Sequence, residues 1–284
     1  MSVENEDRKE FCSWLRAEWQ LSMFSLEDTS GQTIDLKQTF APEPRLLYGA
    51  IKVCIFIWML SYFIIDMVTY ENGAYWLIFL SNWGITVSFL SNILTLFALI
   101  KTTYLANKHQ LQGHAIDNSN SHTFMTRFTL AICVIAMNAV VPISFVYWLT
   151  IYNGRFTFKQ LQLHGLLGGI NIIDVIVINC MPIRLKQIFL VYAFGLTFLI
   201  WSLIHAASGI GHHDSDNDPE TDDDSIYSTL NWNKRPGGAA IMATFLLFIA
   251  VPLIFFVLFF LSKLLKPRYC TSKVKAEKVS TDEV

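Results

Sequence analysis

The chain has 284 residues, of which 53% are hydrophobic and 14% aromatic, while only 15% are charged. A soluble domain of this length carries more charge, so the composition excludes an ordinary soluble globular protein. The formal net charge is −2 at pH 7, with basic and acidic residues in different segments, and this pattern does not suggest nucleic acid as a partner.

Six long apolar runs divide the chain, and each is close to the roughly 20 residues that a helix needs to cross the hydrocarbon core. They cover residues 46–67, 74–100, 128–151, 161–180, 188–207 and 239–261. The sequence therefore predicts an all-α membrane protein, a six-transmembrane-helix bundle. Its parts are an N-terminal tail (1–45), one membrane domain (46–262) and a short basic C-terminal tail (263–284).

Lysine and arginine are distributed unevenly between the segments that join the spans. With the N-terminus in the cytoplasm, 16 of the 21 basic residues fall in the tails and in the second and fourth connections. Short loops rich in Lys and Arg stay on the cytoplasmic side. We therefore expect both termini in the cytoplasm and the protein in the plasma membrane or the endoplasmic reticulum, with membrane lipids as its surroundings.

The N-terminal tail contains apolar residues near helical spacing: Phe11, Trp14, Leu15, Trp19, Met23 and Leu26. This spacing predicts an amphipathic helix. The helix would either lie in the inner membrane interface or pack on the cytoplasmic end of the bundle.

Polar residues inside the spans are the candidates for chemistry, because such groups are costly in lipid and face the bundle interior. The second span has a small and polar stripe: Ser81, Gly84, Ser88, Ser91, Asn92 and Thr95. The fourth has His164, Gly168, Asn171 and Asp174 near one face, and His205 lies near the outer end of the fifth.

Ser81 and His164 are predicted to lie at similar depth. Both spans run inward on this topology, with Ser81 seven residues and His164 three residues from the start of its run, a difference of about one helical turn. A hydroxyl and an imidazole at one depth are the minimal parts of a nucleophile and its general base. Asn82, Asn171 or Asp174 would orient the imidazole, although Asp174 lies about two to three turns below His164.

Helix packing is the competing explanation for the same residues. Stripes of Ser and Gly let helices approach closely, and Gly165 with Gly169 forms a GxxxG pattern beside His164. The Ser and Asn side chains would then have purely structural roles.

The acidic segment between the fifth and sixth spans resembles part of a calcium-binding loop. Asp214, Asp216 and Asp218 match the opening of an EF-hand, but Pro219 replaces the required Gly and Ser225 the bidentate Glu. We predict a solvated acidic loop and expect neither a metal site nor a cofactor.

Several short motifs occur along the chain: Leu15-Arg16-Ala17-Glu18, Leu80-Ser81-Asn82-Trp83, Leu163-His164-Gly165-Leu166 through Asp174, Met181-Pro182-Ile183-Arg184 and Tyr227-Ser228-Thr229-Leu230-Asn231-Trp232. With these motifs in this order, the sequence resembles the rolling stone family of membrane proteins, named for a role in myoblast fusion, from about Phe11 to Tyr269. The resemblance implies a membrane role in cell fusion or membrane organisation.

The rolling stone family is in turn similar to the androgen-induced membrane hydrolases, which cleave fatty acid esters of hydroxy fatty acids with an intramembrane Thr and His. That similarity implies Ser81 as the nucleophile, with Ser in place of Thr, and His164 as the base.

Three functions then compete. The rolling stone resemblance implies a non-enzymatic role in fusion, which is the family-level expectation. The alternative is an intramembrane lipid-ester hydrolase that uses Ser81 and His164. A transporter would require a continuous polar path, and the inner half of the bundle below Asp174 and Thr95 is too apolar for one.

Overall fold

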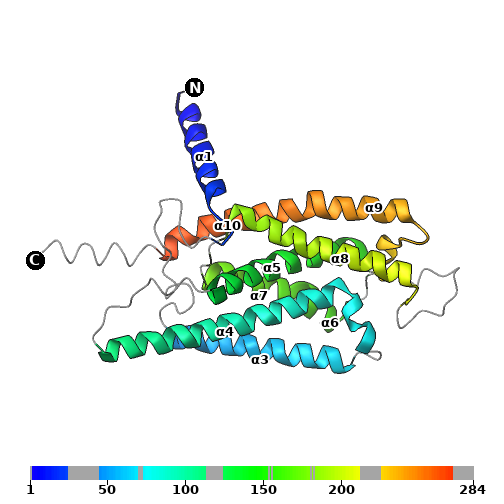
Figure 1. Ribbon diagram of the computed structural model, residues 1–284, viewed down its shortest axis with the longest axis horizontal. Coiled ribbons are helices and arrows are strands. Elements are labelled where there is room, and N and C mark those ends of the chain that lie inside the picture. The colour runs from blue at the N-terminus through cyan, green and yellow to red at the C-terminus, as the bar shows by residue number, and fades with distance from the viewer. Residues whose placement is uncertain are drawn as a thin grey trace, which may run out of the picture.

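The computed structural model describes residues 2–24, 45–69, 73–112, 124–152, 154, 156–179, 181, 183–211 and 225–270. All regular elements within these ranges are helical. Six helices are long and apolar enough to cross a membrane: Leu46–Thr69, Leu80–Leu105, Phe124–Leu149, Phe158–Ile178, Leu185–Ser208 and Pro236–Leu265. They lie side by side along one axis (Figure 1), which confirms the predicted six-helix membrane bundle.

The first three spans are simple helices. After α1 (Ser2–Gln20), the chain forms α3 (Arg45–Thr69), a short 3₁₀ helix η1 (Gly73–Ile78), α4 (Leu80–Gln112) and α5 (Phe124–Val146), which continues into a π-helical turn, η3 (Tyr147–Ile151). We call the end of the bundle where α3 begins the termini end and the opposite one the loop end.

The last three spans combine several helix types. The fourth comprises α6 (Phe158–Leu161), η4 (Gln162–Leu166), α7 (Leu167–Ile172) and η5 (Ile173–Ile178). The fifth comprises η6 (Leu185–Gln187) and α8 (Ile188–Ser208). After η7 (Ser228–Leu230), the sixth comprises α9 (Pro236–Phe245), η8 (Leu246–Ala250) and α10 (Val251–Cys270).

The second span begins later than its apolar run suggests. Residues 73–78 form η1 at the loop end, where the Trp76 indole donates to Asp66 at 2.8 Å and its carbonyl accepts from the Asn82 side chain at 2.6 Å. These bonds hold the chain across the end of the bundle, so α4 starts only at Leu80. Ser81 consequently lies in the first turn of its helix rather than seven residues below the start.

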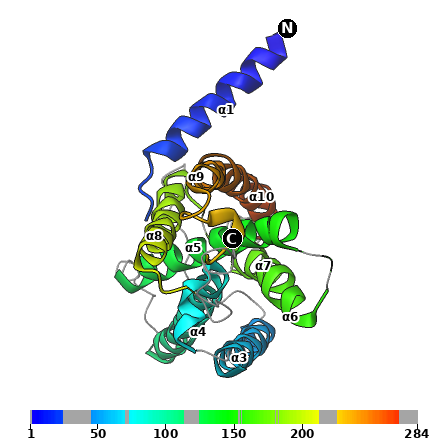
Figure 2. The ribbon, with the colours of Figure 1, turned by 90° about the vertical axis from the view of Figure 1, so that its right-hand side faces the viewer.

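α5 is the central helix, because it contacts α4, α7, α8 and α10 (Figure 2). Two glycines permit close approach to it: a Cβ on Gly84 would lie 3.3 Å from Val140 and Ile143, and one on Gly168 would lie 3.3 Å from Ser144. The predicted Gly165–Gly169 pair does not have this role, since a Cβ on Gly169 would meet nothing within 4 Å.

The second half of α1 packs on the termini end of the bundle. Trp14 lies 6.0 Å from Phe259, measured between ring centroids, and the fully buried Glu18 carboxylate pairs with Arg184 at 3.5 Å and Lys263 at 3.0 Å. The helix stands across the bundle axis and projects outward from it (Figures 1 and 2). Of the two predicted placements of this helix, the structure shows the one in which it packs on an end of the bundle. Contact of α1 with lipid stays a prediction.

Candidate functional site

An apolar cavity of about 280 Å³ lies inside the bundle between α5, α8, the sixth span and the start of α4. Ser81 and His164 both line it, so the structure brings the predicted nucleophile and base to one cavity. They arrive there from separate elements, the first turn of α4 and the π-helical turn η4.

Ser81 sits beside a tyrosine from the segment that precedes the sixth span. The Tyr227 hydroxyl accepts a hydrogen bond from the backbone N–H of Leu80 at 3.1 Å and is also bonded to the side chain and backbone of Ser81. Desolvation raises the pKa of Tyr227 to about 12. The hydroxyl therefore stays protonated at neutral pH and keeps a proton that it can donate.

His164 is held by stacking. Its ring lies parallel to that of Tyr147, with 3.6 Å between centroids and 7° between planes, and only 7% of the residue is exposed. Its carbonyl accepts from the Trp148 indole at 2.7 Å. Nδ1 of the ring is buried without a hydrogen-bond partner, and no hydrogen bond joins His164 to Ser81 among the described residues. The imidazole is thus fixed in place and can accept a proton.

Three π-helical turns border the cavity: η3 supplies Tyr147, η4 supplies His164 and η8 supplies Leu246 and Leu247. In η3 the backbone N–H of Tyr152 bonds to the carbonyl of Tyr147 at 2.9 Å, five residues back. Such turns widen a helix and are frequent at functional sites. Here three of them supply residues to the wall of one cavity.

The three predicted orienting residues all bond elsewhere. Asn82 donates to the Trp76 carbonyl at 2.6 Å, and Asn171 donates to the Ser88 hydroxyl at 3.1 Å. Asp174 pairs with Lys52. None of them touches the imidazole in this structure, and stacking on Tyr147 takes the place of the expected hydrogen bond.

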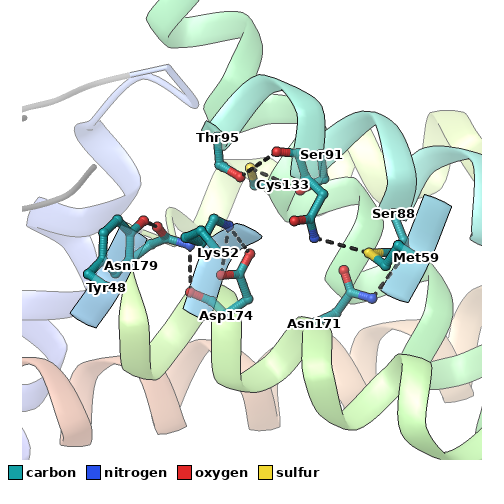
Figure 3. A network of polar contacts seen from close by, with 11 residues as sticks. Tyr48, Lys52, Met59, Ser88, Ser91, Thr95, Cys133, Asn171, Asp174 and Asn179 are labelled. Carbon is teal, nitrogen blue, oxygen red and sulfur yellow. Dashed lines mark hydrogen bonds and ion pairs between the residues drawn. The ribbon is translucent and has the colours of Figure 1, made fainter. Parts of the chain in front are cut away.

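Lys52 and Asp174 form an ion pair within the membrane-spanning region (Figure 3). Lys52 Nζ lies 2.8 Å from both carboxylate oxygens, and the two side chains are 0% and 4% exposed. Asn179 donates to the Asp174 carbonyl at 2.6 Å and accepts from the Tyr48 hydroxyl. This network joins α3 to the fourth span, and its residues do not line the cavity.

His205 lies in a different part of the bundle from Ser81 and His164. Its Nε2 lies 2.8 Å from the Gly211 carbonyl, and the residue lines a second, more polar cavity of about 210 Å³ at the loop end, together with Ser202 and Trp232. It does not reach the cavity of Ser81 and His164. Among the described residues no cluster of His, Cys, Asp and Glu could hold a metal ion, and the acidic stretch 212–224 lies outside them.

Sequence reasoning missed four polar residues that line the cavity: Asn138, Tyr147, Tyr227 and Thr229. Asn138 could have been predicted from the sequence, because a lone amide in an otherwise apolar span is costly and calls for a polar role. Tyr227 lies in a loop motif far from Ser81 in sequence, and no periodicity places such a residue on the end of another helix.

The six long apolar helices among the described residues indicate an integral membrane protein, and the cavity gives its bundle an apolar site. Searches against protein-family models, curated proteins and solved structures found no match.

Proposed function

We propose that this protein is an intramembrane lipid-ester hydrolase in which Ser81 is the nucleophile and His164 the general base. One observation supports this above all: both side chains line the same apolar cavity. The wall is otherwise built mainly from aliphatic and aromatic side chains, which suit an acyl chain.

The reaction follows from the groups at the loop-end part of the cavity. His164 removes the proton from Ser81 as its oxygen attacks the ester carbonyl carbon, and a tetrahedral intermediate forms. The imidazolium then gives that proton to the departing alcohol oxygen as the C–O bond breaks, leaving an acyl-serine. Water, deprotonated by the same imidazole, attacks the acyl-serine and releases the fatty acid.

Two neighbours support this chemistry. Tyr147 fixes the plane of the imidazole by stacking. The protonated hydroxyl of Tyr227, which lies against the first turn of α4, supplies a donor for the oxygen that becomes negatively charged. The reaction requires the Ser81 hydroxyl to leave Tyr227 and approach the imidazole of His164.

Labelling by a lipid-like fluorophosphonate tests the proposal on the purified protein in detergent. Wild type should react, with the adduct mapped to Ser81 by mass spectrometry, and Ser81→Ala should not. His164→Ala should react at least about a hundredfold more slowly, because general-base catalysis contributes that much. Thr86→Ala is the matched control: Thr86 lies on the same helix, bonds only to the Asn82 carbonyl and does not line the cavity.

The proposal is wrong if folded wild type fails to react, or if Ser81→Ala is labelled as quickly as wild type. Folding of every variant is checked by its thermal transition and by its elution as one monodisperse species.

A role in cell fusion or membrane organisation is the prediction that the rolling stone resemblance carries, and we retain it as a second function for the same chain in the plasma membrane or endoplasmic reticulum. It requires neither Ser81 nor His164 to react. If Ser81→Ala supports fusion as well as wild type does, fusion and hydrolysis are separate properties of the protein.

A further inference from the structure

The cavity that holds Ser81 and His164 is elongated along the bundle axis. Its lining residues fall within 138–147 on α5, 191–199 on α8 and 242–251 on the sixth span. At 1.5 Å per residue, each of these three stretches corresponds to about 12 to 14 Å. The cavity therefore extends from the loop end, where Ser81 and His164 lie, towards the middle of the bundle.

The hydrophobic core of the bundle closes the inner end of the cavity. Val191 lines the cavity and also belongs to the buried core cluster that contains Met137, Ile188 and Phe255. These three side chains are buried, and none of them lines the cavity. Protein cores are packed as densely as organic crystals, so this cluster leaves no room for a chain to pass. A ligand that lies along the cavity must therefore end at Val191.

Polar side chains are unequally distributed along the wall. Most of them lie at the loop end: Ser81, Tyr147, His164, Tyr227 and Thr229. Apart from Asn138, the wall between these residues and the inner end is apolar. This distribution matches a ligand that has one polar end, placed beside Ser81, and one unbranched apolar chain.

The dimensions of the cavity limit the length of that chain in two ways. An extended chain advances roughly 1.2 Å per bond, so a length of about 13 Å holds roughly eleven bonds. The volume gives a separate limit. An apolar cavity of about 150 Å³ holds benzene, or about 25 Å³ per carbon. The volume of about 280 Å³ therefore corresponds to about eleven carbons. Length and volume agree, and a second chain does not fit.

We propose that the substrate's acyl group is a single chain of medium length, about ten to twelve carbons, and that Val191 sets this limit. The carbonyl carbon lies beside Ser81 and the methyl end lies against Val191. This inference deepens the proposed function and rests on it for the placement of the carbonyl end. It also explains how the protein spares the membrane around it, because a chain that fills half of the hydrocarbon core spans about 15 Å and exceeds the cavity.

Binding of free fatty acids tests the chain length without any need for turnover. Equilibrium dialysis of the purified protein gives the dissociation constants of radiolabelled saturated acids, even-numbered from octanoate to stearate. Each constant is referred to the free concentration of the acid in water. A methylene that leaves water for an apolar site strengthens binding about fourfold, so wild type should bind dodecanoate about a hundredfold more tightly than octanoate. From dodecanoate to stearate the affinity should stop rising.

Substitutions of Val191 should shift this limit in opposite directions. Val191→Ala removes two carbon atoms at the inner end and should raise the limit by about two carbons, whereas Val191→Phe adds four and should lower it by about four. Val257 is the matched control, because it is 58% exposed on α10 and does not line the cavity. Val257→Ala and Val257→Phe should leave the limit unchanged.

Three results would overturn the inference: no saturable binding of any acid, an affinity for wild type that keeps rising up to stearate, or the same limit in wild type and Val191→Ala. If Val191→Phe does not fold, wild type and Val191→Ala still decide.

The two proposals can fail separately. A protein that shows the limit near dodecanoate but does not react with the fluorophosphonate keeps the chain-length inference and loses the hydrolase. A protein that reacts at Ser81 but binds longer acids ever more tightly has the opposite outcome.

Discussion

His164 is a histidine inside a membrane span that has a ring partner but lacks a hydrogen bond to Nδ1. A histidine that served only to pack helices would gain by donating or accepting such a bond, because an unpaired polar atom in an apolar setting costs about 1–3 kcal/mol. The stack on Tyr147 keeps the ring at the cavity wall, with Nδ1 buried and without a hydrogen bond. This combination favours a reacting or ligand-binding role over a structural one.

Two substitutions of Tyr147 separate the effect of ring stacking on His164 from the effect of the tyrosine hydroxyl. Tyr147→Phe keeps an aromatic face against the imidazole and should label with fluorophosphonate at nearly the wild-type rate. Tyr147→Leu removes the face, so the ring can leave its orientation; we expect a rate about tenfold lower and a loss of about 1 kcal/mol in stability. Labelling kinetics and thermal unfolding measure the two effects, and equal rates for the two variants would show that the stack does not matter.

That Ser81 and His164 line one cavity could be predicted from their depth, although the start of each span was misplaced. Ser81 lies in the first turn of α4, and His164 lies six residues after Phe158. Hydropathy gives the order and approximate depth of residues along a span, and a cavity whose lining on α5 extends from Asn138 to Tyr147 tolerates errors of one or two turns. Tyr147 and Asn138 could not be assigned in this way, because which face of α5 borders the cavity depends on how the helices pack.

At the scale of elements, polar contacts hold α3 to the bundle at two levels. Lys52 pairs with Asp174 in the half near the termini, and at the loop end Asp66 accepts from Trp76 at 2.8 Å and pairs with Lys159 at 2.7 Å. Much of the remaining surface of α3 is exposed and apolar, as expected for a helix at the edge of a bundle that faces lipid. These contacts therefore add polar attachment points to the apolar packing of α3, in which Met59 and Tyr62 belong to a buried cluster with Ile85 and Trp76.

Replacing one partner of the Lys52–Asp174 pair should destabilise the protein more than replacing both. Lys52→Met leaves a buried carboxylate without its cation and should destabilise the protein by about 3–5 kcal/mol. The double variant Lys52→Met with Asp174→Leu should recover most of this loss, since no isolated charge remains. Denaturant unfolding of the three proteins in one detergent makes the comparison, and a double variant no more stable than Lys52→Met would contradict it.

Glu18 joins α1 to the bundle through ion pairs with Arg184 and Lys263, in addition to the ring contact of Trp14 with Phe259. Glu18→Gln removes the charge that faces Arg184 and Lys263, so α1 should detach more often. Arg16 is exposed on the same helix, and trypsin should cleave after it at least about ten times faster in the variant, which corresponds to about 1.4 kcal/mol. Gln20→Ala, at an exposed position of α1, is the control and should leave cleavage unchanged.

Long helices were predictable and short irregular ones were not. Each span was visible as an apolar run, because lipid requires a helix with an apolar surface. The 3₁₀ helix at Gly73–Ile78 continues an apolar run without a break in composition, and it forms because Trp76 bonds to Asp66 and Asn82. The π-helical turns likewise leave the hydropathy unchanged and add one residue to a turn, so no periodicity in the sequence indicated them.

At the scale of the whole molecule, α1 and the last turns of α10 lie at one end of the bundle (Figure 1). Three basic residues lie at this end as well. Arg184 and Lys263 both pair with Glu18. Lys186 lies over the ring of Trp19, and Lys263 lies over the ring of Trp14. The bundle therefore has a basic end, and the positive-inside rule predicts that this end faces the cytoplasm. Ser81 and His164 would then lie towards the opposite side of the membrane.

Thiol labelling in intact cells tests this orientation. Cys12 is exposed on α1 at the termini end, and Ser228 is exposed at the loop end. In a background without other cysteines, a membrane-impermeant maleimide should label Ser228→Cys in intact cells at the plasma membrane and label Cys12 only after permeabilisation. The reverse pattern would place the termini outside. It would also place Ser81 and His164 towards the cytoplasmic side, so that the proposed lipid ester would enter from the inner leaflet.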